Sequence, residues 1–138
     1  MKKTFFALIL QLIALVSVGQ YFVGKTIEEV KTAVSAELKM TKTQIETNDA
    51  GVLTMNAEDE FMSIKYVFNS EKKCSIAMIQ PLTQEVKDFL LNDLNQNGTK
   101  LKSEKWANLW LYQEGGTNIL VFYTADKDLG YFKAQKSK

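Results

Sequence analysis

The spacing of apolar residues predicts two amphipathic helices. Residues 24–39 and 83–96 carry apolar side chains three or four positions apart, which is typical of a helix with one buried face. These positions are Ile27, Val30, Val34 and Leu38 in the first segment and Val86, Phe89, Leu90 and Leu94 in the second. Thr26 and Thr83 precede the two apolar stripes and are the expected N-caps. We expect Gly98 to end the second helix in the left-handed conformation that glycine adopts readily.

Alternation of apolar and polar residues with a period of two predicts strands in much of the remaining chain. The segment Trp106–Thr124 is expected to form a hairpin after the second helix. It contains a long apolar run, residues 118–124, which we expect to form a central strand because it is rich in β-branched and aromatic residues. Gly115 and Gly116 supply the positive φ that a tight hairpin turn needs. Four shorter strands are expected between the helices, at residues 42–47, 51–56, 61–68 and 74–79.

Together these elements predict an α+β fold with two layers. The expected order is α-β-β-β-β-α-β-β, and the short turns between successive strands favour antiparallel pairing. One sheet of about five to six strands with both helices packed on one face would bury both apolar stripes. The other face would then meet solvent or a partner. We expect residues 125–138, which are polar and rich in lysine, to form a frayed tail.

Residues 1–19 have the pattern of a secretory signal peptide. Two lysines precede an apolar stretch over residues 5–18, and small residues end it. We expect cleavage after Gly19, which leaves a single α+β domain over residues 20–138. A retained membrane anchor and a buried helix are the alternatives, but the apolar stretch is shorter than the roughly 20 residues of a typical membrane-spanning helix. The pattern therefore predicts a periplasmic or secreted protein.

The composition argues against several classes of function. The chain of 138 residues contains no His and no Arg. His is the side chain most often used for acid–base chemistry near neutral pH and a common metal ligand. Arg supplies the bidentate contact to phosphate and to guanine. The net charge is only +1, so little long-range attraction to nucleic acid is expected. We expect no catalytic residues, metal, cofactor or nucleic-acid partner.

Cys74 is the one cysteine of the chain, so no internal disulfide can form. It follows Lys72 and Lys73, and nearby cations can lower the pKa of a thiol and make it reactive. The alternative is a small buried side chain, which is the commoner role of a free cysteine. The sequence leaves open whether Cys74 is reactive.

A stripe of aromatic and polar residues is the candidate binding site. With a period of two, one side of the first hairpin strand holds Trp106, Asn108, Trp110 and Tyr112, and the other side holds Leu109 and Leu111. If the leucines pack beneath the helices, the aromatic rings lie on the uncovered face, where such rings favour recognition. The alternative is that the stripe faces the core, since Trp is mostly buried for packing reasons.

These observations predict a small exported binding or inhibitor-like protein of a bacterial envelope, without catalytic activity. Its partner would be another protein of the envelope or extracellular space, recognised through the aromatic sheet face. A carbohydrate- or lipid-binding accessory domain is the second hypothesis, and it would use the same aromatic rings. A hydrolase that uses carboxylates alone is a third, because acidic residues are abundant although no pair stands out.

Overall fold

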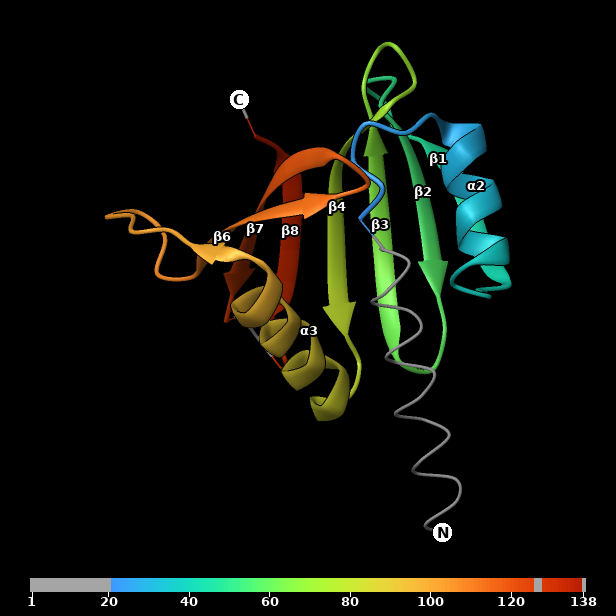
Figure 1. Ribbon diagram of the computed structural model, residues 1–138. Helices are drawn as coiled ribbons and strands as arrows, with labels where there is room; N and C mark the ends of the chain where they lie inside the picture. Colours follow the sequence, from blue (N-terminus) through green and yellow to red (C-terminus); the bar gives the residue numbers. More distant parts are fainter. Residues whose placement is uncertain (1–20, 126–127, 138) are drawn as a thin grey trace, which may run out of the picture.

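The protein is a mixed α+β structure in which two helices accompany one antiparallel sheet. The computed structural model describes residues 21–125 and 128–137, and Figure 1 shows the arrangement. Eight strands follow one another across the sheet in the order β1-β2-β3-β4-β8-β7-β6-β5. The strands are β1 (Lys42–Thr47), β2 (Leu53–Glu58), β3 (Met62–Phe68), β4 (Cys74–Pro81), β5 (Thr99–Lys100), β6 (Leu109–Glu114), β7 (Thr117–Thr124) and β8 (Tyr131–Lys136).

Both helices begin at the predicted caps. Helix α2 spans Ile27–Ala36 and α3 spans Gln84–Asn97. The Thr26 hydroxyl accepts a hydrogen bond from the backbone N–H of Glu29 at 3.3 Å, and the Glu29 carboxylate accepts one from the backbone N–H of Thr26 at 3.3 Å. The Thr83 hydroxyl accepts from the Val86 N–H at 3.2 Å. These bonds satisfy N–H groups that the first helical turn leaves unpaired.

One face of the sheet, which we call the helix face, carries the core. Residues directly opposite one another on neighbouring strands share a face. The row Met55, Tyr66, Ala77, Ala134, Val121 and Trp110 crosses six strands in this way, and every member is at most 1% exposed. Buried residues of α2 and α3 join the same core cluster. The two apolar stripes therefore bury against one sheet face, with α2 near the β1–β2 end and α3 over the other half (Figure 1).

Residues 21–23, which we call the N-terminal segment, complete the cover over the middle of the helix face. The Phe22 ring lies 6.0 Å from the Tyr66 ring, and the Tyr21 ring lies 6.2 Å from the Tyr112 ring. The Glu114 carboxylate accepts the backbone N–H of Phe22 at 2.9 Å and that of Tyr21 at 3.3 Å. The prediction that the helices alone cover this face is therefore incomplete.

The predicted number of strands is too low. The expected frayed tail instead contains β8, which lies inside the sheet between β4 and β7. Phe132 and Ala134 of β8 are fully buried, Lys133 alternates with them, and Lys136 ends the strand on the same side as the buried residues. Those lysines concealed the period of two. The remaining missed strand, β5, has only two residues, and the expected central position of the strand at 118–124 is confirmed because β7 lies between β8 and β6.

Gly98 ends α3 as expected but not in the expected conformation. Its φ is −100°, which is an extended conformation open to any residue. Close packing explains the glycine instead, because a Cβ atom there would lie 2.8 Å from the Leu94 carbonyl oxygen and 3.2 Å from that of Leu111. The predicted hairpin turn is confirmed, with positive φ at Gly115 and Gly116. The predicted signal peptide at residues 1–19 lies outside the described residues.

Candidate functional site: the open sheet face

We call the sheet face opposite the helices the open face. In the described part of the chain, the residues that α2 and α3 bury join the core of the helix face. The open face has a continuous surface because its residues stand directly opposite one another on successive strands. One such row is Asn56, Lys65, Met78, Lys133, Phe122 and Leu109, and its neighbour is Thr54, Val67, Ile76, Gln135, Leu120 and Leu111.

Apolar side chains of β4, β6 and β7 form two groups on the open face, which we together call the apolar band; Lys133 and Gln135 of β8 stand between the β4 group and the β6–β7 group. The apolar band consists of Ile76, Met78, Leu109, Leu111, Leu120 and Phe122. Phe122 and Leu109 are 9% and 8% exposed, and the other members are half-buried. Trp106, in the loop before β6, extends the band with a ring 4.9 Å from that of Phe122. Apolar side chains gathered on an uncovered face typically mark an interaction surface.

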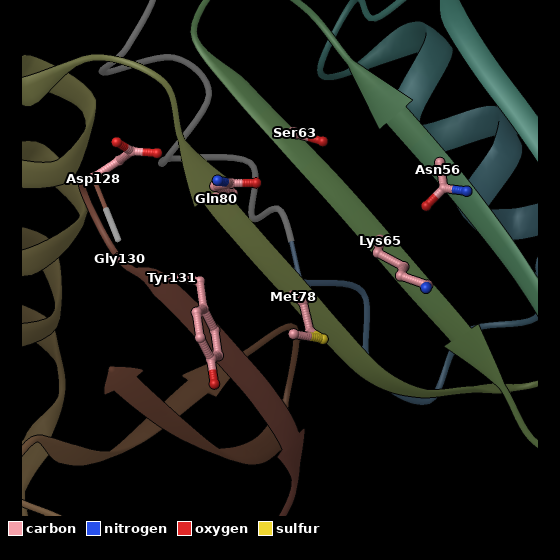
Figure 2. A pocket seen from close by; sticks show the side chains of 8 residues that line it. All are labelled: Asn56, Ser63, Lys65, Met78, Gln80, Asp128, Gly130 and Tyr131. Carbon is pink, nitrogen blue, oxygen red and sulfur yellow. The ribbon is translucent and has the colours of Figure 1, made fainter. Parts of the chain in front are cut away.

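A pocket of about 480 Å³ opens beside this band. Figure 2 shows side chains from β2, β3, β4 and β8 around it, together with the turn before β8. Tyr131 and Met78 provide its apolar part, and Lys65 stands away from Asp128. The lining residues are Asn56, Ser63, Lys65, Met78, Gln80, Asp128, Gly130 and Tyr131.

Uncharged polar groups dominate the chemistry of this pocket. Asn56, Gln80, Ser63 and Tyr131 can each donate and accept hydrogen bonds, while Lys65 and Asp128 contribute one charge of each sign. No hydrogen bond or ion pair joins these side chains to another of the described residues. Among the described lining residues, Asp128 is the one carboxylate.

Trp110 and Tyr112 of the predicted stripe lie on the helix face. The Trp110 Nε1–H donates to Asn95 Oδ1 of α3 at 3.0 Å, and the Trp110 side chain is 1% exposed. The Tyr112 hydroxyl donates to Asp93 Oδ2 of α3 at 3.0 Å. Burial, together with the nearby Asp93 carboxylate, raises the pKa of Tyr112. Of the two alternatives for Trp110 and Tyr112, the structure favours the core-facing one, because α3 offers polar partners to both ring tips.

Trp106 and Asn108 precede β6 and do not continue the stripe. The Trp106 side chain is 36% exposed and contacts Phe122 on the open face rather than Trp110. Asn108 is half-buried, and its backbone carbonyl accepts the Tyr123 N–H at 3.1 Å. The structure thus separates the four predicted residues, and Trp106 is the aromatic member that belongs to the open face.

Cys74 is buried against the N-terminal segment. Its Sγ lies 3.5 Å from the Ile76 carbonyl oxygen, and its side chain is 2% exposed. Burial raises the pKa of the thiol to about 12, which outweighs the lowering effect of its hydrogen bonds to backbone carbonyls. A thiol with such a pKa is almost fully protonated at neutral pH and is a weak nucleophile. Of the two alternatives for Cys74, the structure favours the small buried side chain.

The pocket residues were not identified from the sequence, although part of the signal was present. Ser63 and Lys65 alternate with buried residues of β3, so their position on the open face follows from the period of two. Tyr131 follows Gly130 in a stretch that was assigned to a frayed tail. The pairing of β8 with β4, which brings Tyr131 beside Gln80 and Met78, joins distant parts of the chain and leaves no local pattern.

Comparison of this chain with protein families, curated proteins and solved structures gives no match. Neither helix in the described ranges has the length and apolar character needed to cross a membrane. Among the same residues, no three Cys, Asp or Glu side chains gather where they could hold a metal ion. The functional argument therefore depends on the open face itself.

Proposed function

We propose that this protein is a non-catalytic binding protein that recognises another protein through its open face. One observation carries the proposal: an apolar band lies on a sheet face that no helix of the described structure covers. Half-buried Leu, Ile and Met side chains next to an exposed Trp provide the apolar centre of an interface, and the polar pocket residues provide part of its rim. The N-terminal pattern of the sequence supports a partner in a bacterial envelope or outside the cell.

The test is capture of a partner by variants of the open face. We expect Leu120→Lys to abolish capture of a specific protein from envelope extract, because it places a charge in the middle of the apolar band. Trp106→Ala should weaken capture at least about tenfold if the ring is an energetic centre of the interface. Leu82→Lys is the control for the charge change, because Leu82 is a leucine between β4 and α3 that is 40% exposed and lies outside the apolar band.

The captured protein, once purified, should bind the wild type and the Leu82→Lys variant with equal affinity in a calorimetric titration. Binding by Leu120→Lys with the affinity of the wild type would contradict the proposal, since a charge buried under a partner on the open face should weaken binding. Circular dichroism and urea unfolding of each variant separate a lost contact from a lost fold.

A carbohydrate-binding function is the second candidate, and the pocket favours it. Its uncharged donors and acceptors suit sugar hydroxyls, and the Tyr131 ring offers an apolar surface to a sugar ring. A glycan panel with the wild type and Tyr131→Ala tests this candidate directly. Saturable binding of a neutral sugar that Tyr131→Ala abolishes, with Leu120→Lys retaining it, would favour carbohydrate over a protein partner.

A further inference from the structure

The two edges of the sheet differ in their protection against pairing with another strand. Edge strands expose unpaired backbone N–H and C=O groups, and proteins usually blunt them with short length, charged side chains, proline or a bulge. The edge strand β5 has only two residues. The other edge, β1, has six residues, and all of them are exposed. Its register with β2 is regular throughout, and its sequence contains no proline.

The charges of β1 match a second copy of the same strand. Lys42, Gln44 and Glu46 alternate along the open-face side of β1, as their partners on β2 show. If β1 pairs antiparallel with itself and Gln44 stands opposite Gln44, each Lys42 stands opposite a Glu46. Shifting this register by two residues in either direction loses both charge pairs. Opposite charges directly across an antiparallel pair stabilise it, and like charges destabilise it.

The other side of β1 supports the same register. Ile45 is the most exposed of the large apolar side chains described, at 43%. It lies on the helix-face side because it pairs with the buried Met55. In the register centred on Gln44, Ile45 of one copy stands opposite Thr43 of the other. Thr43 would cover part of an apolar side chain that the monomer leaves in water, which adds a favourable contribution.

We propose that the protein forms a symmetric dimer in which β1 pairs antiparallel with β1 of a second copy, centred on Gln44. The twofold axis is then perpendicular to the sheet, so the sheet continues across the dimer with both open faces on the same side. Two copies of the recognition surface would point the same way and could bind a repeated or dimeric partner with increased avidity. An interface of six residues per copy is small, so the dimer should depend on protein concentration.

Charge reversal tests the register. In sedimentation velocity runs over a concentration series, we expect wild type to shift from monomer to dimer. Glu46→Lys alone and Lys42→Glu alone should each remain monomeric, because each places like charges opposite one another. An equimolar mixture of the two variants should form a heterodimer, since every lysine then meets a glutamate across the strand pair.

Glu104→Lys is the control, because it makes the same charge change at an exposed loop position and should dimerise like wild type. Ile45→Pro, which removes a backbone N–H that points away from β2, should be monomeric, with its fold checked by circular dichroism. The proposal is overturned if wild type stays monomeric at every concentration. It is also overturned if the dimer survives Glu46→Lys and Ile45→Pro, or if the mixed variants remain monomeric. The outcome is independent of the capture experiment, because dimerisation is measured without a partner.

Discussion

At the scale of the residue, Trp110 shows how one polar atom can decide the face that a strand presents. Its ring fills the core between β6 and α3, and its Nε1–H needs a partner because burial without one is costly. Asn95 supplies that partner from the last turn of α3. The period of two correctly placed Trp110 and Tyr112 on one side of the strand. Which side faced the helices depended on α3, which the strand sequence cannot reveal.

We predict that Asn95→Ala lowers the free energy of unfolding by about 1 kcal/mol, because it leaves the buried indole N–H without its acceptor. Urea unfolding followed by tryptophan fluorescence measures the change. Asn92→Ala is the control, since Asn92 is an exposed asparagine of the same helix whose side chain accepts only a long 3.5 Å bond from Gln96. Equal effects of the two substitutions would show that the indole bond contributes nothing.

At the scale of the element, local patterns predicted most boundaries well. Both N-caps, the β6–β7 turn and the strands β1 to β4 lie close to their expected positions. Capping residues, turn glycines and alternation of apolar and polar residues are all local signals that span only a few positions of the sequence. Strand β8 shows where this reasoning fails. Lys133 interrupts its apolar residues on the open side, and its place between β4 and β7 comes from pairing across the sheet rather than from its own sequence.

Gly130 fixes the entry into β8. Its φ is +75°, and a Cβ atom there would lie 2.5 Å from the Thr124 carbonyl oxygen and 2.8 Å from the Tyr123 hydroxyl oxygen. Gly116 has a similar φ of +82° but open space around it. Alanine at Gly116 would therefore cause backbone strain alone, whereas alanine at Gly130 would cause the same strain and a steric clash.

We predict that Gly130→Ala is more destabilising than Gly116→Ala. The second change should cost about 1 kcal/mol, the usual penalty for alanine in the left-handed region. The first adds a clash with backbone that cannot move without disturbing β7. Thermal unfolding of both variants measures the difference, and similar melting temperatures would contradict this explanation.

At the scale of the whole molecule, buried thiol and phenol groups make the stability of the fold depend on pH. Burial raises the pKa of the Cys74 thiol to about 12 and raises the pKa values of Tyr66 and Tyr112 as well. The folded protein thus keeps protons that the unfolded chain releases at lower pH. The stability that these groups supply is complete below about pH 8 and falls as the pH rises from there towards 12.

We predict that the urea midpoint decreases between pH 8 and pH 10.5. Tyr112→Phe should reduce this decrease, because it removes one of the groups whose proton the fold retains. Urea titrations of both proteins at the two pH values provide the measurement. A pH dependence as steep in Tyr112→Phe as in wild type would mean that the Tyr112 hydroxyl does not contribute to it.

The bonds between Glu114 and the N-terminal segment have a consequence for the order of folding. Phe22 and its acceptor are 92 positions apart, so the N-terminal segment cannot dock until β6 is in place. Until β6 is in place, the side chains of Tyr21, Phe22 and Val23 have no core to pack against and remain accessible to chaperones. Docking of the N-terminal segment on the helix face is therefore a late step in the folding of this domain.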